Sequence, residues 1–285
     1  VQSEGWDQLL DTDLGESCNH GCRTIKSVLE ERVIKPFAHS IENPSYGAAY
    51  SAILFGPPGT AKTTICEALA KRMGYDFCVI DTAAFLADGL TNVAARIRYV
   101  FSRLMALEKC VILFDEIEEF ALDRETPGIS MESRMLTTAM LTAINDLRRK
   151  KKSIFFIATN RLRAFDSAIT RPGRFDMQLF VGTPNLNSRV IQFEKKLAKV
   201  TDNKTRDKAI ESYRDFLESV WSKDAMFMNY LEGEQFASAS ADILKSNGEL
   251  TRKEMLAILQ QQALVMTVRG PVREEFIASM DLTRL

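Results

Sequence analysis

Residues 56–64 read GPPGTAKTT, and this stretch decides the fold because it is nearly a complete phosphate-binding loop. The strict pattern is G-x-x-x-x-G-K-[ST], with glycine directly before the lysine. Here Ala61 stands directly before Lys62. The apolar run 51–55 (SAILF) precedes the loop, and a helical pattern follows it. A loop between a buried strand and a helix presents backbone N–H groups and the positive end of the helix dipole to phosphate oxygens.

Each residue type in this loop suits a nucleotide. Gly56 and Gly59 allow a tight path and a close approach of phosphate oxygens, Lys62 can reach the β- and γ-phosphates, and the Thr63 hydroxyl suits a Mg²⁺ ligand. Ala61 is expected to take a right-handed conformation, in which its methyl group is tolerated. We assign nucleotide contacts to the whole loop: Gly56, Pro57, Pro58, Gly59, Thr60, Ala61, Lys62, Thr63 and Thr64.

Two acidic residues end a later hydrophobic run. Residues 110–116 read CVILFDE, a hydrophobic run that ends in Asp115 and Glu116. In a parallel sheet ligands bind beyond the carboxyl ends of the strands, where the phosphate-binding loop also lies. Asp115 is expected to hold Mg²⁺ through its water shell, and Glu116 to polarise the attacking water. The alternative is an acidic loop that starts a helix, because two further glutamates follow.

The rest of the chain falls into two regions. Up to residue 182, short apolar runs alternate with helical patterns, which is typical of a parallel sheet covered by helices on both faces. The predicted strands are 51–55, 77–81, 110–114, 153–159 and 177–181, and the predicted helices include 92–107 and 131–149. After residue 182 the sequence shows helical periodicity throughout. We expect an α/β nucleotide-binding domain with its N-terminal lead-in over 1–182 and a small all-helical domain over 183–285.

Four motifs together resemble the AAA ATPases, a clade of the AAA+ proteins. GPPGTAKT, ILFDE, IATN (157–160) and FDSAITRPGRFD (165–176) occur in the order and approximate spacing of that family. The resemblance implies a P-loop NTPase sheet followed by a helical AAA+ lid, and hydrolysis of ATP with Mg²⁺. It implies that Asn160 is sensor 1 and that Arg171 and Arg174 are arginine fingers. In this family such fingers reach a neighbour's nucleotide, so a ring is expected, usually a hexamer.

The chain also departs from the family pattern. Members that thread polypeptide carry an aromatic pore loop ahead of the second helix, and 89–91 (GLT) stands at that place without an aromatic. Phe85 is expected to pack under this loop. In the helical region the usual S-G-A-D helix start resembles 238–243 (SASADI) locally, but 251–255 (TRKEM) fits better by spacing. In that register Arg252 is a candidate sensor 2 residue for the γ-phosphate, with a solvated surface arginine as the alternative.

Composition narrows the functional classes. The chain has 285 residues with a net charge of −1, which gives no general attraction to nucleic acids or anionic membranes, and no apolar run is long enough to span a bilayer. Its five cysteines are scattered, and its start lacks the features of a signal peptide. We therefore expect an intracellular, reducing compartment: the cytoplasm or an organelle matrix or stroma. The spacing of Cys18 and Cys22 resembles half of a zinc site, but a loop is favoured because no second pair follows.

Three functions remain in consideration. The first is a homo- or hetero-oligomeric ring ATPase that remodels protein assemblies through an unknown substrate or adaptor. The second is an ATP-binding structural or regulatory subunit of a larger complex, which the weak pore loop favours. A nucleic-acid motor is disfavoured by the neutral charge.

Overall fold

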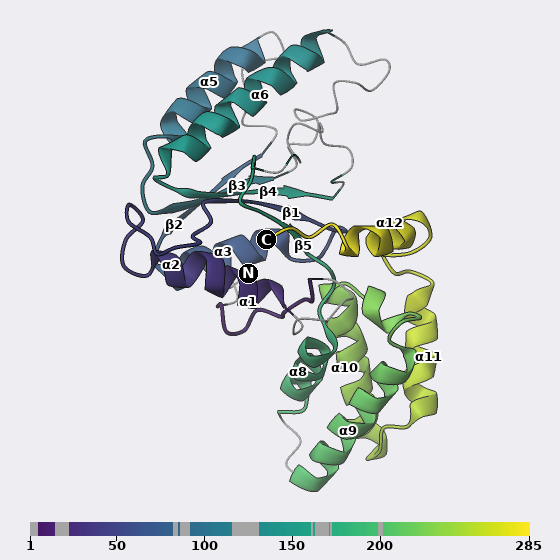
Figure 1. Ribbon diagram of the computed structural model, residues 1–285. Helices are drawn as coiled ribbons and strands as arrows, with labels where there is room; N and C mark the ends of the chain where they lie inside the picture. The colour runs from purple at the N-terminus through teal and green to yellow at the C-terminus, as the bar shows by residue number, and fades with distance from the viewer. Residues whose placement is uncertain are drawn as a thin grey trace.

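A parallel sheet of five strands organises the N-terminal part of the chain in this computed structural model (Figure 1). The structure describes residues 5–14, 23–81, 85, 92–115, 131–160, 162, 171, 173–198 and 202–285. The strands are β1 (Ser51–Phe55), β2 (Asp76–Ile80), β3 (Cys110–Asp115), β4 (Ile154–Thr159) and β5 (Met177–Phe180). Their order is β2-β3-β4-β1-β5, and every neighbouring pair is parallel. The predicted fold class is confirmed, with strand limits within one residue of those expected.

Helices cover both faces of the sheet. One face carries α5 (Val93–Leu104) and α6 (Met131–Lys150). The other carries α1 (Ile25–Leu29), a π-helical turn (Glu30–Ile34), α2 (Lys35–Phe37) and α3 (Lys62–Met73). Because the three central strands are buried along nearly their whole length, each contributes side chains to both layers.

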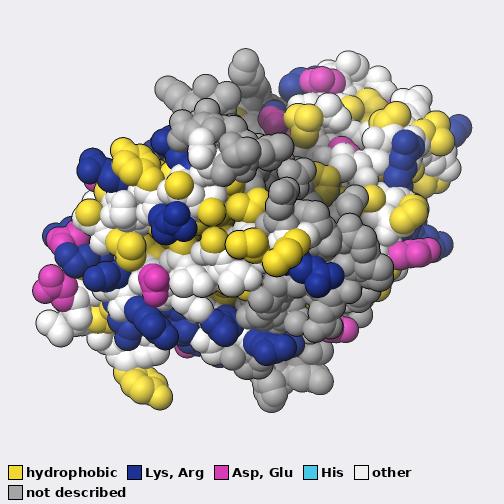
Figure 2. Space-filling view, turned by 90° about the horizontal axis from the view of Figure 1, so that it is seen from above, with side chains coloured by type: hydrophobic (Ala, Val, Ile, Leu, Met, Phe, Trp, Pro, Cys, Tyr) yellow, Lys and Arg dark blue, Asp and Glu magenta, His cyan; other side chains and the backbone are white. Residues whose placement is uncertain are grey.

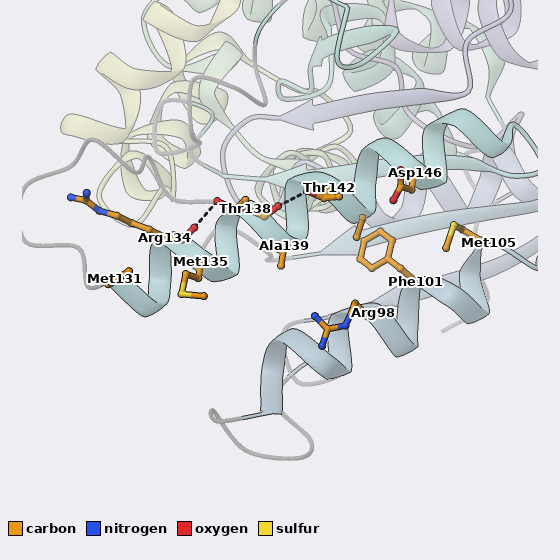
Figure 3. Close-up of a pocket in the computed structure, with 11 residues that line it drawn as sticks. Arg98, Phe101, Met105, Met131, Arg134, Met135, Thr138, Ala139, Thr142 and Asp146 are labelled. Carbon is orange, nitrogen blue, oxygen red and sulfur yellow. Dashed lines mark hydrogen bonds between the residues drawn. The ribbon is translucent and has the colours of Figure 1, made fainter.

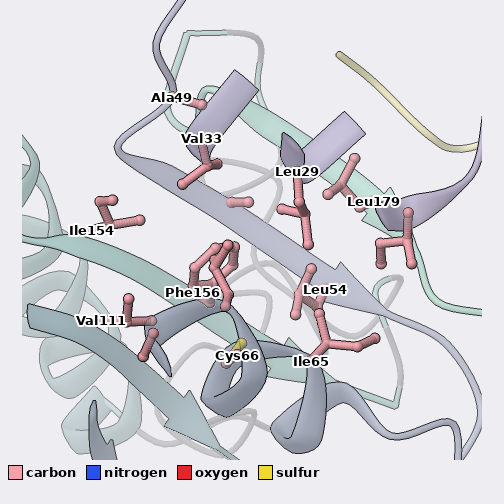
Figure 4. Close-up of a cluster of buried hydrophobic side chains, with 14 of the residues drawn as sticks. Leu29, Val33, Ala49, Leu54, Ile65, Cys66, Val111, Ile154, Phe156 and Leu179 are labelled. Atoms are coloured by element: carbon pink, nitrogen blue, oxygen red, sulfur yellow. The ribbon is translucent and has the colours of Figure 1, made fainter. Parts of the chain in front are cut away.

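The two apolar layers have different characters. The layer under α5 and α6 is aromatic: Phe101 stacks on Phe114 with ring centroids 5.3 Å apart. The opposite layer is built of aliphatic side chains around Leu54 and Phe156 (Figure 4). Cys66 belongs to this second layer, and burial raises the pKa of its thiol well above the usual value. Cys66 is therefore a buried apolar side chain, as expected for a cysteine in an apolar segment.

The predicted helical region is present after residue 182. Its helices are α8 (Leu186–Lys196), α9 (Asn203–Val220), α10 (Tyr230–Asn247), α11 (Arg252–Ala263) and α12 (Pro271–Met280), with a short 3₁₀ turn at Ala225–Phe227. The first four share a core of their own, in which Phe193 and Tyr213 stack with centroids 4.1 Å apart. Figure 1 shows this bundle beside the sheet domain, with α12 set apart from it.

Helix α12 and the last residues return to the sheet. Phe276 and Met280 join the aromatic layer, where Phe276 contacts Phe180 of β5 edge to face. Arg284 then pairs with Gln178 through two backbone hydrogen bonds of 2.7 Å, antiparallel to β5. The expected division at residue 182 placed this segment with the lid. Helical periodicity shows that a helix has an apolar face, but not which domain covers that face.

No helix of the described residues combines the length and apolar character needed to cross a bilayer. Within the same residues, no cluster of three or more His, Cys, Asp or Glu side chains could hold a metal ion. Cys18 and Cys22 lie outside the described residues, so the zinc alternative remains only a sequence pattern.

Candidate active site

The loop that follows β1 lies at the carboxyl edge of the sheet. The end of β5 and the helical region both approach it closely. Gly56 has φ +155°, and a Cβ atom added there would lie 2.2 Å from the carbonyl oxygen of Val181. Only glycine allows β1 and the end of β5 to approach this closely. A Cβ at Gly59 would lie 3.1 Å from Nδ2 of Asn229, so the loop also contacts the helical region directly.

Lys62 is buried within this loop. Its Nζ donates to the carbonyl oxygens of Gly56 and Pro57 and to Oδ1 of Asn160, each at 2.9 Å. Asn160 lies this close because β1 and β4 are adjacent, with Phe55 opposite Thr159. The predicted phosphate-binding lysine and the predicted sensor 1 residue are therefore in direct contact. An ammonium held by three oxygens at the start of a helix is oriented to meet an anionic group.

The candidate magnesium ligands also meet. Thr63 Oγ1 donates to Oδ2 of Asp115 at 3.1 Å. Asp115 ends β3, next to β4, so the sheet brings it to the edge where the loop lies. A hydroxyl and a carboxylate are the hard oxygen ligands that Mg²⁺ prefers, and the pair fits that ion. Glu116, the predicted catalytic base, lies outside the described residues.

The expected right-handed conformation of Ala61 is wrong. Ala61 has φ 64° and ψ 28°, which is the left-handed region, and it forms the N-cap of α3. The family pattern has glycine at this position because a Cβ in that conformation costs about 1–2 kcal/mol. Closure of the loop onto the start of α3 imposes the conformation, and the alanine carries the strain. Ala61 is therefore a tolerated but strained variant.

Replacing Ala61 by glycine is expected to stabilise the protein. Relief of the left-handed strain, about 1–2 kcal/mol, exceeds the extra chain entropy that glycine loses on folding, about 0.5–1 kcal/mol. Urea unfolding of Ala61→Gly should show a gain of about 0.5–1 kcal/mol. Lys109→Gly is the matched control, because Lys109 has φ 50° in a turn far from the loop. A loss of stability in Ala61→Gly alongside a gain in Lys109→Gly would contradict this account.

A polar network joins the loop to the helical region. Asn229 is the N-cap of α10, with Oδ1 accepting from the backbone N–H of Glu232. The Glu232 carboxylate in turn accepts a hydrogen bond from the backbone N–H of Asn229 at 2.7 Å. It also accepts from the N–H and the hydroxyl of Thr267, at 2.7 and 2.9 Å. Asn229 Nδ2 donates to the Thr267 hydroxyl at 3.1 Å. The side-chain amide of Asn229, which borders Gly59, is therefore held by Glu232 and by Thr267.

Arg189 lies beneath this network. Its side chain is fully buried, and burial lowers the pKa of its guanidinium to about 10. One nitrogen, Nη2, donates to the carbonyl of Met228, while Nε and Nη1 have no hydrogen-bond partner. The guanidinium faces the ring of Trp221, 5.6 Å from its centroid. The hydrogen bond from Arg189 therefore fixes Met228, the residue before the N-cap of α10, although burying the guanidinium costs desolvation free energy.

One cavity borders the loop, and a second, which no loop residue lines, shares Phe180 and Phe276 with the first. The first, of about 280 Å³, lies between the loop and α12, and Asn160, Val272 and Glu275 contribute to its lining. The second, of about 400 Å³, is lined in part by Asp13 from the lead-in and Trp221 from the helical region. Apart from Asn160 and the loop residues, these lining residues were not predicted from the sequence. Most of them are ordinary in type, and they meet only because distant segments fold together.

The candidate arginine fingers lie at the other edge of the sheet. Arg174 is joined to Arg171 by a backbone hydrogen bond of 3.2 Å, and both side chains are exposed, with no ion-pair partner among the described residues. Two residues on, Asp176 accepts hydrogen bonds from the N–H of Ser51, at the start of β1. The phosphate-binding loop begins at the other end of β1, about 16 Å away. The finger segment therefore lies at the opposite edge of the sheet from the loop of its own chain.

Asp176 anchors this segment. Its Oδ2 accepts from the N–H groups of Tyr50 and Ser51 at 2.9 and 3.0 Å and from the Ser51 hydroxyl at 2.9 Å. Its Oδ1 accepts from Arg148 at 2.7 Å. Arg148 begins the basic run RRKKK at 148–152, and its pairing with Asp176 gives this arginine a structural role. No local pattern predicts a contact between residues 28 positions apart.

The assignment of Arg252 as sensor 2 is not supported. Arg252 begins α11, its guanidinium lies 5.7 Å from the ring centroid of Phe216, and Thr251 caps the helix. The residue that borders the loop is Asn229, at the start of α10, whereas Arg252 follows the far end of that 18-residue helix, about 27 Å away. Residues 238–243 lie inside α10. The start of α10 carries an N-x-x-E capping box that was visible in the sequence.

The predicted pore-loop residues 89–91 lie outside the described residues. Phe85 is described: it is fully buried and stacks on Phe101 with centroids 6.4 Å apart. Phe85 is therefore a core side chain, and its predicted packing under residues 89–91 stays a prediction.

Comparisons with known proteins agree with this geometry. Residues 52–183 match the family described as "ATPase family associated with various cellular activities (AAA)". The chain is 36% identical over 157 residues to an ATP-dependent zinc metalloprotease FtsH 1 of Alkaliphilus metalliredigens, covering 52% of this chain and 27% of that protein. It is 33% identical over 175 residues to a cell division control protein 48 homolog B of Arabidopsis thaliana, covering 59% and 29%. The chain thus spans little more than a quarter of the length of these relatives.

The fold has a solved counterpart. The crystal structure of a FIGL-1 AAA domain superposes with a TM-score of 0.61 at 20% identity, covering 98% of this chain and 89% of that one. The family match covers the phosphate-binding loop, Asp115, Asn160 and the finger segment, and the fold match extends over the helical region. Residues 52–183 of this chain therefore match the AAA ATPase family, and the chain shares the fold of an AAA domain.

Proposed function

We propose that this chain hydrolyses ATP with Mg²⁺ as one subunit of a hexameric ring, and that the ring remodels protein assemblies. One observation carries the proposal: Arg171 and Arg174 lie at the opposite sheet edge from their own Lys62. A finger placed there can stabilise a phosphoryl group only on a neighbouring subunit. Both guanidinium groups are exposed and have no ion-pair partner in the described part of the chain, which supports this role over surface salt bridging.

The residues divide the reaction between them. Lys62 and the loop N–H groups bind the β- and γ-phosphates, and Asn160 orients the water or the γ-phosphate beside them. Glu116 polarises the water, whose oxygen bonds to the γ-phosphorus as the bond to the bridging oxygen of ADP breaks. A neighbour's Arg174 stabilises the charge that develops on the transferring group. Thr63 and Asp115 would hold Mg²⁺, which neutralises charge on the phosphates when bound.

Turnover at different protein concentrations tests the proposal. The rate of phosphate release per subunit should rise with concentration and level off as rings form. Glu116→Gln should lose at least about 100-fold in rate while sedimenting as the same assembly. A rate per subunit that is independent of concentration would contradict action in trans. Binding of ATP and assembly without turnover would favour the second function, a structural or regulatory ATP-binding subunit.

The Asp176 anchor gives a separate prediction. Asp176→Asn keeps the size of the side chain but removes the charge that Arg148 meets, so the finger segment loses its fixed position. We expect a fall in ATPase rate of about tenfold or more with little change in the affinity for ATP, because a misplaced catalytic group acts mainly on the transition state. Arg148→Met should reproduce the effect, and Lys152→Met, which removes an exposed pair with Glu108, should not. Equal ATPase rates in all three variants would contradict the role of Asp176.

A further inference from the structure

A groove between α5 and α6 forms a hollow whose lining includes none of the residues of the nucleotide site. It has a volume of about 1040 Å³, at the upper end of the roughly 300–1,000 Å³ of small-molecule sites. Figure 2 looks down on this side of the molecule and shows hydrophobic side chains gathered with lysines and arginines around them. A hollow of this size on a sheet-covering helix pair has the dimensions of a peptide-binding groove.

The groove results from residue spacing on α6. Met131, Met135, Ala139 and Ala143 form one row at intervals of four and face the groove (Figure 3). The two alanines leave open the space that larger side chains would fill against Phe101 of α5. Met131 and Met135 are 79% and 65% exposed, so the apolar row is accessible to a partner. Exposed methionines adapt their shape to varied apolar surfaces.

The polar lining of the groove consists of two threonines and three charged side chains. Thr138 and Thr142 turn their hydroxyls back to carbonyl oxygens of their own helix, each at 2.9 Å, and so offer no free donor to the groove. The charged groups of the lining are Arg98 and Arg134 toward one end and Asp146 at the other. None of the three side chains has an ion-pair partner in the described part of the chain. The methionine end of the groove is therefore basic, with both cations available for pairing.

We propose that this groove binds an acidic, amphipathic segment of a partner protein. The apolar face of the segment would lie on Met131, Met135 and Ala139, and its carboxylates would pair with Arg98 and Arg134. Charge complementarity selects this occupant over a neutral apolar ligand, because two unpaired arginines on the rim favour a carboxylate-bearing chain. A helix with anchors at intervals of three and four residues suits a groove between two parallel helices. The groove would then be a recruitment site formed by residues other than those of the nucleotide site.

The proposal is tested by selecting, from a displayed library of random 16-residue peptides, those that bind this chain. We expect enriched peptides to place Leu, Ile, Met or Phe at helical spacing and to carry Glu or Asp. Measured by fluorescence polarisation, their affinity should fall at least tenfold for Arg98→Glu/Arg134→Glu and for Met135→Asp. Arg103→Glu, on the same helix but outside the groove, should bind normally. Thermal melting checks that each variant is folded; all four substituted side chains are solvent-exposed.

Three outcomes would overturn the proposal. The selection could enrich nothing, or it could enrich peptides without acidic residues. Enriched peptides could also bind the double variant as well as they bind the native chain. If instead the double variant changes the oligomeric state and no peptide binds, the groove is a contact between copies of this chain, and the proposed partner is wrong.

Discussion

Arg174→Ala should reduce the ATPase rate of the assembled protein by about 10³-fold, the lower end of what an arginine finger contributes. The guanidinium is exposed at the sheet edge where β1 begins, whereas the loop that holds the nucleotide follows the end of β1. Its loss should therefore leave each subunit's affinity for ATP unchanged and remove stabilisation of the neighbour's transition state. Phosphate release under saturating ATP, together with equilibrium binding of a fluorescent ATP analogue, separates these two effects.

Arg149→Ala is the matched control for that measurement. Arg149 is an exposed arginine near the same sheet edge, at the end of α6, and it lies outside the finger segment. Its removal should change the rate by less than twofold. The account would be contradicted if Arg174→Ala behaved like Arg149→Ala, or if it weakened ATP binding to a dilute, unassembled subunit.

Glu232→Ala is expected to be the most destabilising single change in the helical region. The carboxylate accepts from Asn229 N and from the N–H and hydroxyl of Thr267. Burial lowers the pKa of the Arg189 guanidinium, and the nearby Glu232 carboxylate partly opposes that shift. Alanine would leave three donors without an acceptor and a buried cation without its nearby anion. We expect a loss of about 3–5 kcal/mol in the free energy of unfolding, measured with urea.

The same substitution should weaken nucleotide binding. Asn229 borders Gly59 of the phosphate-binding loop, and Glu232 fixes Asn229 from the first turn of α10. Glu234→Ala is the control, because Glu234 forms only an exposed pair with Lys196 and should cost about 0–1 kcal/mol. Glu232→Gln retains one acceptor oxygen and should fall between the two. Equal stability of the two alanine variants would show that the network does not support α10.

The sheet and the catalytic edge were predictable because they depend on short, local patterns. Continuous apolar runs specify buried parallel strands, and residues at the ends of such strands, including Asp115 and Asn160, must meet at one edge. Lys62 and Thr63 follow from the loop pattern. Each of these inferences needs only the residues within one strand-loop-helix unit.

The errors arose where one segment depends on another far along the chain. Ala61 takes a left-handed conformation because the loop must close between β1 and α3, which its own sequence does not reveal. Helix starts at Asn229 and Thr251 carry equivalent capping boxes, and only the packing of α10 against the loop distinguishes them. The pairing of Arg148 with Asp176 and the burial of Arg189 are likewise products of tertiary contacts.

Mixing two inactive variants tests the central claim most directly. Lys62→Ala removes the phosphate-binding lysine but keeps the fingers, and Arg174→Ala removes a finger but keeps the lysine. If the fingers act in trans, rings that contain both proteins have sites with an intact lysine next to an intact finger. The account predicts that ATPase activity reappears on mixing and peaks near equal proportions. Activity that never exceeds that of either variant alone, although the two co-assemble, would contradict it.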